Sequence, residues 1–113
     1  MESEELIVET LKEAPTGDTP NTGDTVVIHY VGKLMDGTTF DSSRDQGQPL
    51  EFVLGGKQVI VGLDQGVQEM RVGELAKLTI PPHLGYGQAG RGPIPSNATL
   101  NFEVELLAIK KGN

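Results

Sequence analysis

Residues 25–42 read TVVIHYVGKLMDGTTFDS, and this stretch decides the fold because it holds a long alternating strand followed by a tight turn. In an extended chain Val26, Ile28 and Tyr30 share one face, and the residues between them share the other. Asp36-Gly37 is a strong hairpin signal, because a two-residue turn between strands needs residues that accept positive φ. The stretch therefore predicts two antiparallel strands joined by this turn.

The remainder of the chain continues the pattern of short strands. Strands are predicted at residues 6–11, 25–34, 39–42, 50–54, 74–80 and 100–106, with clear alternation at 25–34 and 100–106. Only residues 60–70 have helical spacing, with Ile60, Leu63, Val67 and Met70 at steps of three or four. Two glycines lower the helix propensity of this stretch, so we expect packing against the sheet to stabilise it. The sum predicts an α+β fold, an antiparallel sheet with one short helix across one face.

The composition excludes several classes of protein. The chain has 113 residues, no cysteine and a formal net charge of −7. This length suits one domain with a hydrophobic core, and the lack of cysteine excludes thiol catalysis, thiolate-bound zinc and disulfides. The negative charge opposes binding to nucleic acid or anionic lipid. No apolar run approaches the about 20 residues that span a bilayer, and no signal peptide is visible. We therefore expect a single cytoplasmic domain over residues 1–113.

Most short motifs in the chain point to no chemistry. Residues 85–90 match the G-x-G-x-x-G string, but prolines precede and follow them where a nucleotide site needs a strand and a helix. His29 and His83 are the only histidines and lack further ligands at metal-binding spacing. Ser42-Ser43 has no evident base beside it in the sequence. We expect neither a bound metal nor a nucleophilic residue.

Two residues have both a functional and a purely structural interpretation. Asp41 directly follows Phe40, which indicates either a carboxylate at a ligand site or a surface turn. Tyr86 stands between Gly85 and Gly87, so its ring could close over the sheet or face a ligand that the bare backbone lets approach. Both alternatives stay open on spacing alone.

Taken together, several segments resemble the FKBP family, the tacrolimus-binding peptidyl-prolyl cis–trans isomerases, and in particular its small single-domain cytoplasmic members. The order and spacing hold from about residue 5 to 110. The matching segments are His29–Leu34, Asp36–Ser43, Val59–Gly66, Val72–Glu74, Leu78–Pro81, Leu84–Gly87, Ile94-Pro95, Ala98–Leu100 and Phe102–Leu107. The resemblance implies a strongly bent antiparallel sheet wrapped around one short helix, which agrees with the periodicity.

The resemblance also implies a shallow apolar pocket between helix and sheet. Its catalytic residues would be Tyr30, Phe40, Asp41 and Tyr86. Its substrate- and drug-binding residues would be Leu50, Gln58, Val59, Ile60, Leu63, Ile94 and Phe102. In the family's drug-bound mode the Ile60 N–H and the Tyr86 hydroxyl donate to ligand carbonyls, Asp41 accepts from a ligand hydroxyl, and the Gln58 carbonyl is a further acceptor.

Such a pocket can catalyse isomerisation without a nucleophile, metal or cofactor. The barrier to rotation about an X–Pro bond, roughly 18–20 kcal/mol, comes from amide resonance that is lost as the group twists. A twisted amide has less charge separation than a planar one, so an apolar pocket disfavours the planar ground state relative to the transition state. We expect Asp41 and Tyr86 to orient the substrate rather than to transfer protons.

The chain departs from the family pattern at several positions. Leu63 occupies the position where many members place a tryptophan at the pocket floor, which predicts a deeper floor and altered macrolide affinity. Leu50 replaces a common aromatic residue at the rim, and Gln46 stands where some members have an arginine that pairs with the pocket aspartate. The loop at 90–94 is one residue shorter than in familiar small members, with Arg91 near its tip.

The leading hypothesis is a monomeric prolyl isomerase that acts on proline-containing peptides and proteins and binds macrolides such as tacrolimus and rapamycin. In the family, the 90–94 loop takes part in recruiting calcineurin or a TOR-type kinase to the drug-bound protein. The alternative is a noncatalytic or weakly catalytic binding or chaperone module that uses the same pocket, because Leu63 replaces tryptophan. Turnover of a short X–Pro peptide distinguishes the two.

Overall fold

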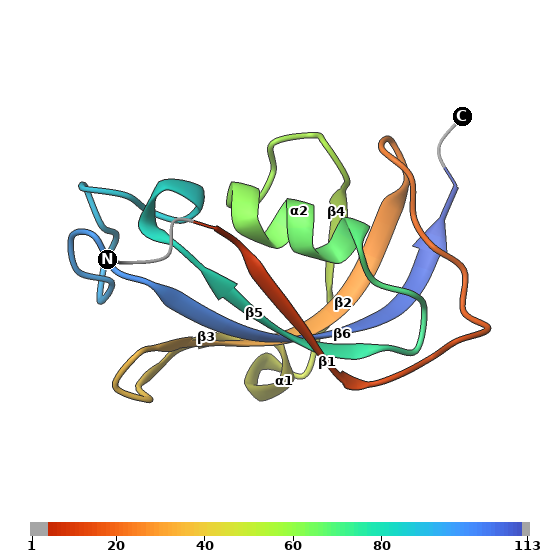
Figure 1. Ribbon diagram of the computed structural model, residues 1–113, viewed down its shortest axis with the longest axis horizontal. Coiled ribbons are helices and arrows are strands. Elements are labelled where there is room, and N and C mark those ends of the chain that lie inside the picture. Colours follow the sequence, from red (N-terminus) through yellow and green to blue (C-terminus); the bar gives the residue numbers. More distant parts are fainter. Residues whose placement is uncertain (1–4, 112–113) are drawn as a thin grey trace.

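The computed structural model describes residues 5–111 (Figure 1). Its strands are β1 (Ile7–Lys12), β2 (Thr25–Leu34), β3 (Thr39–Ser42), β4 (Leu50–Val53), β5 (Leu75–Ile80) and β6 (Leu100–Lys110). Its helices are α1 (Ser43–Gln46), α2 (Val61–Gln68) and the short 3-10 helix η1 (Pro82–Leu84). In the view of Figure 1, α2 lies above the sheet and α1 below it.

All six strands belong to one antiparallel sheet. The strand order is β1-β5-β6-β2-β3, and β4 also pairs with β2. The long pair β2–β6 forms the centre, with Thr25 opposite Lys110 and Leu34 opposite Leu100. Its register shifts between Val27 and Ile28, and such a bulge bends a strand and increases its twist. The sheet curves around α2 (Figure 1).

Helix α2 lies against β5 at a distance that two glycines permit. A Cβ atom at Gly62 would lie 2.4 Å from Cγ2 of Ile80, and one at Gly66 would lie 2.6 Å from Cδ1 of Leu78. Both glycines weaken the helix intrinsically, but they also let it approach the strand closely. This contact agrees with the expectation that packing against the sheet stabilises the helix.

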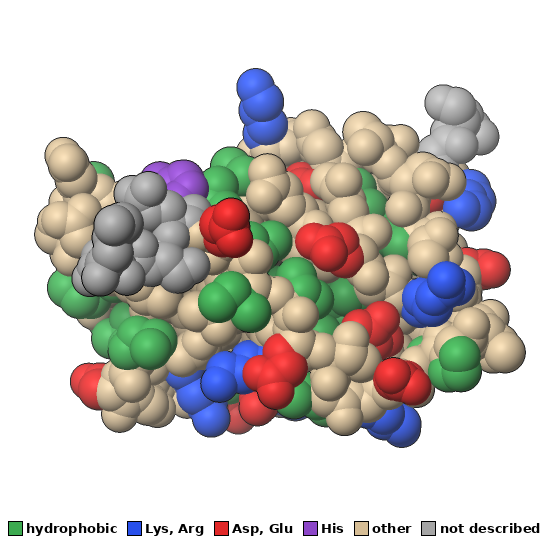
Figure 2. Space-filling model, in the orientation of Figure 1, with side chains coloured by type: hydrophobic (Ala, Val, Ile, Leu, Met, Phe, Trp, Pro, Cys, Tyr) green, Lys and Arg blue, Asp and Glu red, His purple; other side chains and the backbone are tan. Residues whose placement is uncertain are grey.

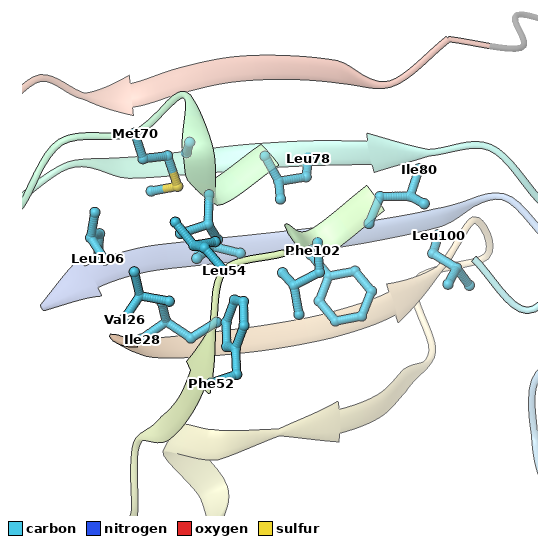
Figure 3. Close-up of a cluster of buried hydrophobic side chains, with 14 of the residues drawn as sticks. Val26, Ile28, Phe52, Leu54, Met70, Leu78, Ile80, Leu100, Phe102 and Leu106 are labelled. Atoms are coloured by element: carbon cyan, nitrogen blue, oxygen red, sulfur yellow. The ribbon is translucent and has the colours of Figure 1, made fainter. Parts of the chain in front are cut away.

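The core lies between α2 and the concave face of the sheet. Its side chains point toward one another from β2, β4, α2, β5 and β6 (Figure 3). Val26 and Ile28 of β2 are fully buried, whereas Val27 and His29 on the opposite face are not. Phe52, 2 % exposed, belongs to this core, and Met70 closes it beyond the end of α2.

The predicted fold is confirmed, with small differences in the elements. Strands β2 and β3 have the expected bounds, and β6 continues four residues past the predicted end, to Lys110. Helix α1 was not predicted. Its single turn begins where the Ser42 side chain accepts a hydrogen bond from the Asp45 N–H, and it ends at Gly47 with φ 70°.

The surface carries both signs of charge. Acidic and basic side chains are interspersed on the face drawn in Figure 2, so the excess of negative charge is not gathered there into one area. Within residues 5–111, no helix has the length and apolar character needed to cross a membrane. No group of three or more histidine and acidic side chains in that same range is placed to hold a metal ion.

Candidate active site

A cavity of about 350 Å³ opens between α2 and the curved sheet. We call it the aromatic cavity, because its wall contains four of the five aromatic side chains of the protein. Its size lies within the range of about 300–1,000 Å³ that is typical of small-molecule sites. The wall is built from β2, β3, β4, α2, β6 and two loops, residues 54–60 and 85–99.

Phe102 of β6 is the centre of the aromatic wall. Its ring stacks on Tyr30 with centroids 5.9 Å apart, and it meets Phe40 edge-on at 5.5 Å. Gly32 makes this arrangement possible, because a Cβ atom there would lie 2.7 Å from the Phe40 ring and 3.0 Å from that of Phe102. The three rings therefore form one rigid apolar surface on adjacent strands.

Asp41 is the only acidic residue of the cavity wall, and three donors orient its carboxylate. Its Oδ2 accepts from the Tyr30 hydroxyl at 2.7 Å, and its Oδ1 accepts from the Ser42 N–H at 2.9 Å and the Gln46 side chain at 3.2 Å. Gln46 thus helps to hold the Asp41 carboxylate in place. Burial of the phenol, together with its hydrogen bond to Asp41, raises the pKa of Tyr30 well above its ordinary value.

The segment between β4 and α2 brings a backbone donor to the cavity. The Gln58 side chain accepts from the Val53 N–H at 2.9 Å and so ties the segment to β4. Ile60 is the N-cap of α2, and its carbonyl accepts from the N–H groups of Leu63 and Asp64. Its own N–H makes no hydrogen bond within residues 5–111. This N–H can therefore meet a carbonyl of a bound molecule.

Tyr86 supplies a second donor from the loop after β5. Its backbone is fixed because its carbonyl accepts from the Gly90 N–H at 3.1 Å, while its hydroxyl has no partner within residues 5–111. The ring lies beneath the guanidinium of Arg91, 5.9 Å from the ring centroid. The Tyr86 ring thus lines the cavity, and its hydroxyl can donate a hydrogen bond to a bound molecule.

Leu63 and Leu50 complete the cavity from opposite sides. Leu63 projects from α2 and is 4 % exposed, which agrees with its expected place at the floor. Leu50 begins β4 at the rim and is half-buried. Both positions are aliphatic, so the only rings in the wall are those of Tyr30, Phe40, Tyr86 and Phe102.

The structure gathers nearly all of the residues expected from sequence into this cavity. Those that line it are Tyr30, Phe40, Asp41, Leu50, Gln58, Val59, Ile60, Leu63, Tyr86 and Phe102. Ile94 does not line it: the side chain is 6 % exposed and packs into the core. Lys57 and Arg91 line it but were not predicted, and no local pattern marks a loop cation as part of a site.

Ser43 has a neighbour that the sequence did not indicate. His29 Nδ1 lies 2.9 Å from Ser43 Oγ, but this hydroxyl also accepts from the Tyr30 N–H at 2.7 Å, and Ser43 as a residue is only 2 % exposed. It fastens α1 to β2 and has no access to a substrate. Ser43 is therefore structural, as is His29.

Comparison with known proteins identifies the family. Residues 17–107 match the family model described as FKBP-type peptidyl-prolyl cis-trans isomerase. The chain belongs to this family. Within it, the chain is 56 % identical over 95 residues to FK506-binding protein 1 of Dictyostelium discoideum, covering 83 % of this chain and 89 % of that protein. It is 49 % identical over 104 residues to peptidyl-prolyl cis-trans isomerase FKBP1A of Xenopus laevis, covering 91 % and 96 %.

Structural comparison agrees. The crystal structure of FkpA from Escherichia coli matches with a TM-score of 0.87 and 44 % identity, covering 96 % of this chain and 49 % of FkpA. The chain thus spans about half of FkpA, and 64 % of FK506-binding protein 2 of Debaryomyces hansenii. The predicted family, its fold and its enzyme class, peptidyl-prolyl cis–trans isomerase, are confirmed.

Proposed function

We propose that the aromatic cavity catalyses cis–trans isomerisation of X–Pro bonds in peptides and proteins. The observation that carries this proposal is the pairing of a rigid aromatic wall with two unused donors, the Ile60 N–H and the Tyr86 hydroxyl. The wall can hold a proline ring, and the donors can hold carbonyls beside it. No covalent bond is made or broken.

In this proposal the cavity lowers the barrier by its polarity and shape. A planar amide is more polar than a twisted one, so transfer from water into an apolar wall raises the free energy of the planar form more. Asp41 cannot easily move, because Tyr30, Ser42 and Gln46 donate to it. Asp41 and Tyr86 therefore act by orienting the substrate, and Phe40 and Tyr30 by enclosing it.

The remaining wall residues act in binding. The ligand contacts the side chains of Val59, Ile60, Leu63, Leu50 and Phe102. The main-chain carbonyl of Gln58 accepts a hydrogen bond from the ligand, since the side-chain oxygen already accepts from the Val53 N–H. Ile94 acts indirectly, by supporting the loop that carries Tyr86. The same wall binds macrolides such as tacrolimus and rapamycin. This is supported by the names of two relatives, FK506-binding protein 1 of Dictyostelium discoideum at 56 % identity and FK506-binding protein 2 of Debaryomyces hansenii at 59 %.

Several broader properties belong to the same proposal. In a drug-bound complex, the loop with Tyr86 and Arg91 would face calcineurin or a TOR-type kinase, because both side chains lie at the cavity that holds the drug.

A cytoplasmic location fits a chain without cysteine. A monomer fits the described surface, where the exposed large hydrophobic side chains are spread over β1, the β2–β3 turn, α2 and β6. Light scattering tests the monomer, and cell fractionation tests the location.

The test of the enzymatic proposal is exchange spectroscopy on a Leu-Pro peptide without a coupling protease. We expect catalytic amounts of the protein to accelerate exchange between the cis and trans forms. Asp41→Asn keeps the size of the side chain but removes its charge. We expect its kcat/KM to fall by less than the factor of about 10²–10⁴ that general acid–base catalysis contributes, because Asp41 transfers no proton in this proposal. Binding of the peptide without acceleration would instead support a noncatalytic module.

A further inference from the structure

Two cations line the aromatic cavity, and the proposed function gives neither of them a role in the choice of substrate. Lys57 lies in the segment between β4 and α2, and Arg91 in the loop after β5. Their backbones are fixed. Arg91 and Ile94 exchange two hydrogen bonds, at 2.9 and 2.8 Å, and Lys57 has a left-handed φ of 59° beside the tethered Gln58.

Neither cation is neutralised by the protein. The ion pairs within residues 5–111 involve Arg44, Lys110 and Lys111, and neither Lys57 nor Arg91 takes part in one. The one carboxylate of the cavity wall, Asp41, already accepts three hydrogen bonds from other groups. The wall therefore carries two positive charges and one negative charge, whereas the whole chain has a net charge of −7.

The guanidinium of Arg91 lies beside one of the two groups that could hold a bound peptide. It lies over the ring of Tyr86, whose hydroxyl is one of the two donors for a ligand carbonyl. Both cationic side chains are on exposed residues at the rim, so an anionic group could reach them without being buried. An exposed ion pair of this kind changes affinity by only a small factor.

We propose that Arg91 and Lys57 make the protein select X–Pro bonds that have an anionic side chain directly before or after the proline. The anion is a carboxylate or a phosphate, which share the same charge chemistry. This inference rests on the proposed isomerase function and adds its substrate class. Preference for such sequences follows from the charge of the wall, not from its aromatic residues.

The test compares kcat/KM from exchange spectroscopy for peptides that differ in one side chain. One series has Glu or Gln before proline, and a second has Glu or Gln after it. We expect a Glu-to-Gln ratio of roughly two to five in at least one series, from the usual strength of exposed ion pairs. A peptide with phosphoserine in place of serine at the preferred position should show a larger ratio, because it carries more charge.

The ratio, rather than the absolute rate, is the diagnostic quantity. The double variant Lys57→Gln, Arg91→Gln should bring the ratio close to one, and Arg91→Lys should retain most of it. About 1 M salt should also remove it by screening. Lys12→Gln, a control that removes one positive charge away from the cavity wall, should leave the ratio unchanged.

Two outcomes would overturn the inference. One is a wild-type Glu-to-Gln ratio near one in both series together with no preference for phosphoserine over serine at either position, and the other is a ratio that survives in the double variant. Failure of the isomerase proposal looks different, because then the neutral Leu-Pro and Gln-Pro peptides would not be accelerated either. Preference for phosphoserine without preference for Glu would identify phosphate as the anion that the cavity selects.

Discussion

Leu63 stands where the family resemblance implies a tryptophan at the pocket floor. The side chain projects from α2 into the aromatic cavity and is almost fully buried. An aliphatic side chain here fills less of the floor than a tryptophan and offers no ring for stacking. The cavity keeps its other aromatic walls, so the substitution changes how tightly a ligand is held more than where it lies.

We expect Leu63→Trp to bind tacrolimus more tightly, by up to roughly tenfold, because an aromatic contact adds about 0.5–1.5 kcal/mol beyond the area it buries. Isothermal titration calorimetry measures the change. Leu107→Trp is the matched control, because Leu107 lies on β6, is 36 % exposed and does not line the cavity. Unchanged or weaker binding by Leu63→Trp would contradict the place of this residue at the floor.

Tyr30 gives the cavity a group that titrates abnormally. Burial and the hydrogen bond to Asp41 favour the neutral phenol, so its pKa is higher in the folded protein than in the unfolded chain. The folded state then holds this proton more tightly. The resulting stability is fully present below about pH 10 and is lost as the pH rises from there through the folded pKa.

In Tyr86→Phe, Tyr30 is the only tyrosine left, and the protein has no tryptophan. We expect its phenolate absorbance to appear at higher pH than that of free tyrosine, for which the pKa is about 10. The free energy of unfolding of Tyr86→Phe should also fall more steeply above pH 10 than that of Tyr30→Phe. A midpoint close to that of free tyrosine would show that the phenol is not shielded.

At the scale of elements, helix α2 depends on its contact with β5. Gly62 and Gly66 place the helix axis close to the strand, against the fully buried Ile80 and Leu78. The N-terminus of the same helix carries Ile60 at the cavity. Displacement of α2 would therefore move the floor and one of the two donors together.

Gly62→Ala tests this close packing. Alanine improves helix propensity by about 1 kcal/mol, but overpacking a core costs about 1–3 kcal/mol. Since Ile80 is enclosed by the core, we expect the overpacking cost to lie in the upper part of this range. The net loss in the free energy of unfolding is then about 1–2 kcal/mol, measured by urea denaturation. The exposed Gln65→Ala on the same helix should change it by less than about 0.5 kcal/mol. A Gly62→Ala protein as stable as the wild type would be evidence against this packing.

The regular elements were predictable because periodicity records which face is buried. Alternation in β2 and β6 and the spacing of Leu63 and Val67 were sufficient for this. Helix α1 could not be predicted in the same way, because one turn is too short to show a period and depends on the Ser42 cap. The end of β6 was also missed, since exposed residues such as Leu107 break the alternation there.

At the scale of the whole molecule, the cavity exists only after folding. Its wall joins residues from Tyr30 to Phe102, so no local stretch of sequence contains the site. The family resemblance pointed to its aromatic and aliphatic members through their motifs. It could not indicate Lys57 and Arg91, whose positions depend on loop backbone geometry, including a left-handed φ at Lys57. Ile94 was expected in the wall but lies in the core instead.

The central claim is that prolyl isomerisation takes place in the aromatic cavity. The most direct measurement is the exchange rate of a Leu-Pro peptide with catalytic amounts of the protein, before and after addition of saturating tacrolimus. We predict that the protein accelerates exchange and that the drug returns it to the uncatalysed rate, because both occupy the same cavity. Exchange that is no faster than the uncatalysed rate, or that tacrolimus leaves unchanged despite binding, would contradict the claim.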